Sequence, residues 1–163
     1  MGKYFGTDGV RGVANEDLTL SMAMRIGQYL GMYYSKQRHA KILIGKDTRL
    51  SGDMFELGLA AGASSMGAHV YLLGVCPTPA VSYLVHKERF DCGIMVSASH
   101  NPYHDNGIKI FNSNGEKMEE DLLLKIEEYM DQDDQLPLAT GEAIGEYYNW
   151  EDGLEIYMSW LKE

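Results

Sequence analysis

The chain has 163 residues, 45% of them hydrophobic, which suits one ordinary folded domain with its own hydrophobic core. No stretch approaches the roughly 20 consecutive apolar residues of a membrane-spanning helix, and the amino terminus has no apolar signal-peptide core, so we expect a cytoplasmic protein without a membrane span. The net charge of −10 is uneven: residues 1–115 carry 11 Lys and Arg against 9 Asp and Glu, and residues 116–163 carry 3 against 15. This balance argues against nucleic acid as a partner but permits an anion site in the first part.

Apolar periodicity predicts an alternation of helices and strands along the chain. In chain order these are a helix at 22–33, a strand at 42–44, a helix from 51 to about 67, a strand at 69–73, a short helix after 79, strands at 93–96 and 108–111, a helix at 122–130, a polar break at 131–137 and a last helix at 154–161. This order predicts a layered α/β fold with a mostly parallel sheet.

The first informative segment is Phe5–Gly12, which reads FGTDGVRG. Its three glycines allow the backbone to approach a ligand closely, and the planar fork of Arg11 suits a phosphate. We therefore expect an anion-binding role for Arg11.

The second segment, Gly45–Gly52, joins a predicted strand to a predicted helix. Ser51 is a good candidate for the helix N-cap. Asp47 and Arg49 can pair and hold the loop in shape, and for these two we favour this structural role over a catalytic one.

The third segment, Ser97–Lys109, reads SASHNPYHDNGIK and follows an apolar strand. Ligands of open α/β sheets bind beyond the carboxyl ends of the strands, which is where this loop begins. Asn101 precedes a proline that stiffens the turn. Such residues also form ordinary turns without any chemistry. Lys109 favours a functional loop, because lysine is depleted in strands unless its ammonium reaches water or a partner.

Ser99 is a better candidate for the reactive hydroxyl than Ser97, because His100 and the stiffened turn follow it directly. Neither serine lies in a Gly-x-Ser-x-Gly elbow, which disfavours an acyl-transfer triad. A serine that carries a phosphoryl group fits better, since that group needs cationic donors. Arg11, Arg49 and Lys109 are the available donors.

Together the three segments resemble the alpha-D-phosphohexomutase superfamily, and the form of the third is similar to the branch that acts on glucosamine phosphates. Serine before His-Asn-Pro, followed by Asp-Asn-Gly-Ile-Lys, is a specific combination. The resemblance runs from Lys3 to the predicted helix near Leu122. It implies a three-layer α/β domain with a mostly parallel mixed sheet between helices, the first domain of a phosphohexomutase.

The resemblance also implies roles for individual residues. Ser99 would carry the phosphoryl group and give one ligand to a Mg²⁺ ion, while Arg11 would bind the phosphoserine. Lys109 would be the candidate general acid or base, and His100 a polar neighbour. The implied reaction interconverts glucosamine 6-phosphate and glucosamine 1-phosphate through a bisphosphate intermediate. Arg49, Asp47 and Asn101 would support the phosphate site.

The superfamily has four domains, whereas this sequence matches the first one. We expect that domain at 1–135 and an acidic connection with the start of an inter-domain helix at 136–163, with domains II to IV absent. The Asp-Gly-Asp-x-Asp-Arg metal loop of the second domain does not occur here. Because phosphoryl transfer depends on charge neutralisation, we expect the chain alone to have no mutase turnover.

Partners are implied by the resemblance alone: a sugar phosphate, a second copy in a homodimer, and in some Gram-positive bacteria a membrane diadenylate cyclase. The alternative that the residues leave open is an α/β module that binds a phosphorylated metabolite or a protein without catalysis. Neither nucleotide-binding glycine motif occurs. Cys76 and Cys92 are expected to be buried hydrophobic residues. The histidines lack the spacing of a zinc site, although His104 is a candidate neighbour of the active loop.

Overall fold

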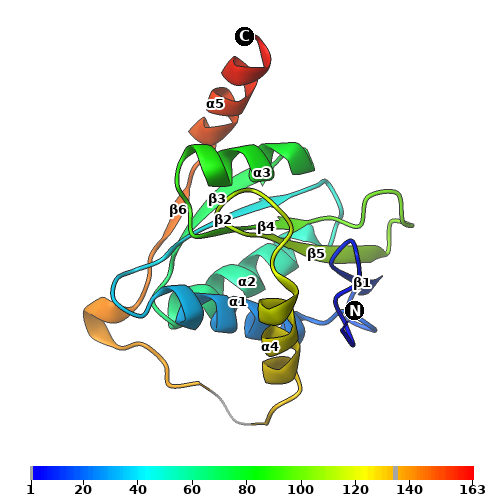
Figure 1. The fold of residues 1–163 in the computed structure, drawn as a ribbon. Helices are drawn as coiled ribbons and strands as arrows, with labels where there is room; N and C mark the ends of the chain where they lie inside the picture. The colour runs from blue at the N-terminus through cyan, green and yellow to red at the C-terminus, as the bar shows by residue number, and fades with distance from the viewer. Residues whose placement is uncertain (1, 134–135) are drawn as a thin grey trace.

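The computed structural model describes residues 2–133 and 136–163 and contains one six-stranded sheet (Figure 1). The strand order is β1-β5-β4-β2-β3-β6. The strands are β1 Val10–Val13, β2 Lys41–Lys46, β3 His69–Val75, β4 Cys92–Val96, β5 Asp105–Phe111 and β6 Tyr147–Asn149.

The sheet is mostly parallel. β2 is parallel to β3 and β4, and β3 is parallel to β6, whereas β5 is antiparallel to both of its neighbours, β4 and β1. Only β5 therefore runs against the common strand direction. The expected mixed, mostly parallel sheet is confirmed.

Helices cover both faces of the sheet, which gives three layers (Figure 1). α1, α2 and α4 pack on one face, and α3 and α5 on the other. The helices are α1 Leu20–Tyr34, α2 Gly52–Ser65, α3 Thr78–Lys87, α4 Glu120–Met130 and α5 Asp152–Leu161, with a short 3-10 turn, η1, at Gly141–Ala143. The three-layer α/β architecture is confirmed, because each sheet face buries its own apolar side chains.

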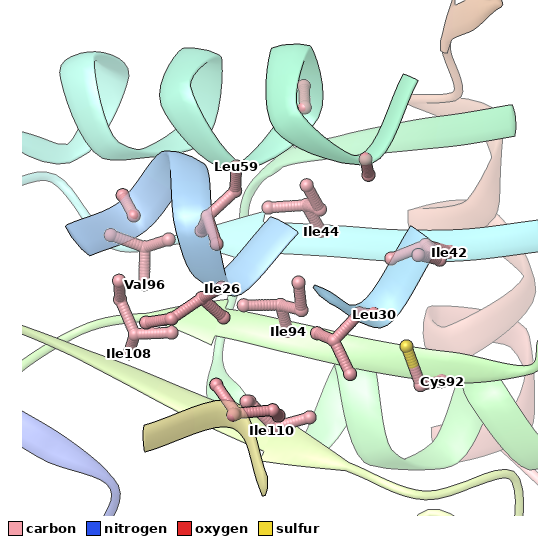
Figure 2. Close-up of a cluster of buried hydrophobic side chains, with 14 of the residues drawn as sticks. Ile26, Leu30, Ile42, Ile44, Leu59, Cys92, Ile94, Val96, Ile108 and Ile110 are labelled. Atoms are coloured by element: carbon pink, nitrogen blue, oxygen red, sulfur yellow. The ribbon is translucent and has the colours of Figure 1, made fainter. Parts of the chain in front are cut away.

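The two faces are built by the period-two alternation of the central strands. Ile42 and Ile44 of β2 belong to the core under α1 and α2, whereas Leu43 between them belongs to the core under α3. Figure 2 shows Ile26 and Leu30 of α1 packed against the first of these cores. Since both faces are covered, the central strands are nearly continuous apolar runs.

Both cysteines are buried and free, as expected. Burial raises the pKa of the Cys76 thiol to about 11, and burial also raises the pKa of Cys92. Both thiols therefore stay protonated at neutral pH and act as small hydrophobic groups.

α1 and α2 approach so closely that their contact contains glycines. A Cβ atom added at Gly27 of α1 would overlap the backbone carbonyl oxygen of Leu59 in α2. We expect Gly27→Ala to lower the free energy of unfolding by about 1–3 kcal/mol, as overpacking does, measured by chemical denaturation. Gly52→Ala is the control, because its Cβ would meet no atom closer than 3.5 Å. An equal loss in both variants would contradict this close packing.

The structure differs from the sequence expectations in three respects. First, the sequence does not predict β1 and β6, because each is short and lies at an edge of the sheet, where few apolar residues are needed. β5 begins at Asp105 and not at Ile108. Ser51 occupies the N-cap position of α2, but its side chain makes no capping hydrogen bond; instead its Oγ accepts a hydrogen bond from Asn106 Nδ2 at 2.9 Å.

The acidic segment expected as a connection contributes to the same sheet. β6 pairs with β3, and α5 packs against α3 through Tyr157 and Trp160, whose rings lie near Tyr83. The polar break predicted at 131–137 includes residues 134–135, which lie outside the described residues. None of the described helices has the length and apolarity needed to cross a membrane.

A buried carboxylate anchors the amino-terminal residues. Glu127 of α4 is 5% exposed and accepts hydrogen bonds from three consecutive backbone N–H groups, those of Lys3, Tyr4 and Phe5, at 3.0, 2.6 and 2.6 Å. Lys3 and Tyr4 also donate to Asp131, one helical turn further on. The segment that leads into β1 is therefore held by α4.

This anchor gives a stability prediction. Glu127→Ala would leave three partly or fully buried N–H groups without an acceptor, and we expect it to lower the free energy of unfolding by about 2–4 kcal/mol. Glu128→Ala is the matched control, because Glu128 is the exposed neighbour on the same helix. Thermal denaturation at neutral pH would measure both. A loss at Glu127 no greater than that at Glu128 would contradict the anchoring role.

Candidate active site

The carboxyl ends of β2 and β4 lie side by side, and the residues that follow them are joined by hydrogen bonds. Asp47 follows β2 and donates its backbone N–H to the carbonyl of Val96, the last residue of β4. Ser97 follows β4 and donates its hydroxyl to Asp47 Oδ2 at 2.7 Å. Parallel pairing of β2 and β4 thus brings the second and third sequence motifs together at the sheet edge expected for ligands.

Arg49 holds the backbone of residues 97–105, which we call the serine loop. Its Nε donates to Asp47, and its two terminal nitrogens donate to four backbone carbonyls of the loop at 2.6 to 3.0 Å. These carbonyls belong to Ser99, Asn101, Pro102 and Asp105. All five N–H groups of the guanidinium therefore have acceptors, and none remains for a phosphate. This geometry supports the structural role favoured for Arg49 and Asp47.

Ser99 lies at the exposed tip of this clamped loop. Its backbone has φ 55°, a left-handed conformation that is unfavourable for a residue with a side chain. Its N–H donates to Ser97 Oγ at 3.1 Å, and its carbonyl accepts from Arg49. Among the described residues, none forms a hydrogen bond with the Ser99 hydroxyl. The loop therefore fixes the backbone of Ser99 and leaves its Oγ free for an incoming group.

The other loop residues have less defined roles. Asn101 donates its side-chain amide to Asp105 Oδ2 at 3.3 Å, which helps to close the loop. His104 Nε2 lies 3.5 Å from Asp105 Oδ1. His100 is exposed, and no described residue forms a hydrogen bond or a ring contact with its side chain. His100 and His104 are near Ser99 in the chain, but among the described residues neither ring forms a hydrogen bond with Ser99.

Asn106 supports the loop from beneath and was not singled out from the sequence. It is completely buried, donates to Ser51 Oγ, and accepts from the backbone N–H of Gly107 at 2.8 Å. A Cβ atom at Gly107 would overlap the Ser97 carbonyl oxygen. The signal available in the sequence was an asparagine followed by a glycine directly before the apolar run of this strand.

Two cations near the loop have no acidic partner among the described residues. Arg11 of β1 is opposite Gly107 of β5, and Lys109 lies two residues further along β5, so both project from the same sheet face. By contrast, Lys46 donates to Asp53 and Glu56. Burial alone would lower the pKa of Lys46, but its hydrogen bonds to the two carboxylates together have the larger effect, so the pKa is raised. Arg11 and Lys109 are therefore the groups left to neutralise an anion.

The described residues do not form a metal site. Across residues 2–133 and 136–163, no group of three or more His, Cys, Asp or Glu side chains could hold a metal ion. In the serine loop, the Asp47 carboxylate is used by Ser97 and Arg49. These residues do not fit a Mg²⁺ ion by themselves.

This three-layer domain presents an exposed serine, held in a clamped loop, at the carboxyl end of a central strand. The family model described as phosphoglucomutase/phosphomannomutase, alpha/beta/alpha domain I, matches residues 2–137. The chain therefore belongs to this family.

The most similar curated relatives include three bacterial proteins, each named phosphoglucosamine mutase. The relatives from Lachnoclostridium phytofermentans and Lachnospira eligens are each 53% identical, and that from Clostridioides difficile is 48% identical. Each alignment covers 99% of this chain but only 36% or 37% of the relative. The chain thus spans little more than a third of the length of these proteins.

Solved structures share the fold. A crystal structure from Thermus thermophilus is 29% identical with a TM-score of 0.77, and the match covers 97% of this chain and 35% of the other. A phosphoglucomutase/phosphomannomutase family protein from Burkholderia thailandensis is 24% identical with a TM-score of 0.76, over 95% of this chain and 34% of that chain. The second likeness concerns the fold alone.

Proposed function

We propose that this chain is the serine-bearing domain of a phosphoglucosamine mutase, which interconverts glucosamine 6-phosphate and glucosamine 1-phosphate. The observation that carries the proposal is the Ser99 hydroxyl, which is exposed and free of hydrogen bonds to the described residues while its backbone is held at φ 55° by the Arg49 clamp. The names of the relatives support the choice of sugar.

In this proposal, Ser99 carries a phosphoryl group in the resting enzyme. During transfer, the bond between phosphorus and Ser99 Oγ breaks while a bond forms to a hydroxyl oxygen of the sugar phosphate. The sugar hydroxyl gives its proton to Lys109, which acts as general base, and Ser99 Oγ takes up a proton as it leaves. Arg11 neutralises charge on the transferring group. The sugar bisphosphate then reorients and returns its other phosphoryl group to Ser99.

Further features of the site and of the protein are proposed from family membership. Mg²⁺ would supply charge neutralisation, with Ser99 giving one ligand through its phosphate and the others coming from outside the described residues. His100 and Asn101 would line the site. We also propose that the protein is cytoplasmic, that it forms a homodimer and that it binds a diadenylate cyclase.

The proposal is tested by locating and moving the phosphoryl group. The native protein at its full length is purified, and one sample is digested and analysed by mass spectrometry. A second, undigested sample is incubated with glucosamine 6-phosphate and then analysed in the same way. We expect phosphate on the peptide that contains Ser99 and its transfer to the sugar. Absence of phosphate on this peptide after treatment with a sugar bisphosphate, or phosphate that no sugar removes, would instead favour the non-catalytic binding module.

A further inference from the structure

Two histidine rings stack where two parallel strands begin. His39 lies two residues before β2, and His69 is the first residue of β3. Their ring centroids lie 4.2 Å apart with an interplanar angle of 20°. The stack follows from the pairing of the strands, because the backbone N–H of His69 donates to the carbonyl of Ala40.

Hydrogen bonds determine where the protons of these two rings lie. His39 Nδ1 is 2.6 Å from the carbonyl oxygen of Gly67. A carbonyl can only accept, so this nitrogen carries a proton. His69 Nδ1 accepts from the backbone N–H of Glu146 at 3.0 Å. That nitrogen must therefore be unprotonated, and the neutral His69 ring has its proton on Nε2.

Some groups around His69 lower its pKa and others raise it. Burial lowers the pKa of His69 and the neighbouring His39 lowers it further, whereas the Glu146 carboxylate raises it. That carboxylate is itself engaged by the hydroxyl of Tyr148, whose ring meets His69 edge-on. Lys41, the direct partner of His69 on β2, adds another cation. The surroundings as a whole favour the neutral ring.

His69 also helps to hold the acidic segment that contains β6. Gly145 donates its N–H to the Ser64 carbonyl at 3.0 Å and accepts from the Ser64 hydroxyl. Val70 donates its N–H to the Glu146 carbonyl at 2.8 Å. Among these described contacts, the bond to His69 is the one whose acceptor can be lost by taking up a proton.

We propose that His69 is an acid-sensitive latch, and that protonation of its Nδ1 releases residues 145–149 from the edge of the sheet. A protonated Nδ1 would face the Glu146 N–H with a second N–H, so the hydrogen bond would become a repulsive contact. The neighbouring His39 ring, 4.2 Å away, also opposes a positive charge on His69. Release would expose the edge of β3 that now pairs with β6.

The sign of the pH dependence follows from linkage. A histidine whose pKa is lowered by docking binds a proton more readily after release. Docking is therefore complete above the ordinary histidine pKa of about 6.5, and weakens as the pH falls below that value.

The experiment is amide hydrogen exchange by NMR, read as protection factors for residues 146–149 at about pH 7.5 and about pH 5. We expect lower protection at about pH 5 than at about pH 7.5, because uptake of a proton by His69 favours release. His69→Asn retains an acceptor oxygen near the position of Nδ1 but cannot be protonated, so we expect its protection to be unchanged. His86→Asn is the control, because His86 is exposed at the end of α3 and should leave the loss of protection at low pH intact.

Unchanged protection in the parent protein, or an equal loss in His69→Asn, would overturn the latch. If His69→Asn does not fold, titration of the parent protein provides an independent reading through the His69 ring proton shifts. A midpoint below that of the same histidine in urea supports the latch. A midpoint equal to or above that value overturns it.

Discussion

Ser99→Gly is expected to abolish phosphoryl transfer without destabilising the protein. The variant lacks the oxygen that would carry the phosphoryl group, and loss of a nucleophile commonly lowers kcat by at least about a thousandfold. The backbone of Ser99, with φ 55°, is in a region that glycine adopts at little steric cost. We therefore expect the free energy of unfolding to stay constant or to rise by up to about 1 kcal/mol.

This combination separates a functional serine from a structural one. Mutase assays on the native full-length protein, together with chemical denaturation, would measure both effects. Ser113→Gly is the control, because Ser113 is an exposed loop serine away from the described network. Turnover within tenfold of the parent in Ser99→Gly would exclude Ser99 as the phosphoryl carrier. A strong loss of stability would show that its side chain supports the fold.

Arg49→Lys is expected to impair both the loop and the reaction, although the charge is retained. Lysine offers one compact ammonium, whereas the guanidinium of Arg49 donates in a plane to Asp47 and to four loop carbonyls. We expect the free energy of unfolding to fall by about 2–4 kcal/mol, since hydrogen bonds from charged groups contribute about 1.5–3 kcal/mol each and water replaces part of them. Misplacement of Ser99 should lower kcat by about a hundredfold.

The matched control is Arg89→Lys, which makes the same chemical change at an arginine outside the loop. Hydrogen exchange in the loop would show whether Ser99 and Asn101 become more mobile. If Arg49→Lys has parental stability and turnover, the clamp is not needed. If turnover alone falls, Arg49 contacts the substrate rather than the loop.

The local pattern of this sequence was sufficient to predict the central layers. Buried parallel strands are apolar on both faces, so Ile42, Leu43 and Ile44 form a clear signal, and amphipathic helices such as α4 repeat at helical spacing. The edges were less predictable. β1 and β6 are stabilised by pairing with residues far along the chain, and such pairing leaves little trace in the local sequence.

At the candidate site, the sequence predicted the pair of Asp47 and Arg49 but not the loop carbonyls that Arg49 also contacts. Asp47, Arg49 and Ser99 do meet, because β2 and β4 are adjacent. That Arg49 donates to carbonyls rather than to an anion depends on the path of the loop backbone. The sequence also did not predict the anchoring role of Glu127, because an acidic residue on an amphipathic helix is usually exposed to solvent.

The bond between Phe5 and Glu127 joins residues 122 positions apart, and this separation has a consequence for synthesis of the protein. At about 5–20 residues per second, the ribosome adds Glu127 roughly 6 to 24 s after it adds Phe5. β1 must also wait for β5, its neighbour in the sheet. The glycine-rich stretch with Arg11 is therefore made before the residues that hold it, and during growth of the nascent chain it is an undocked segment that proteases and chaperones can reach.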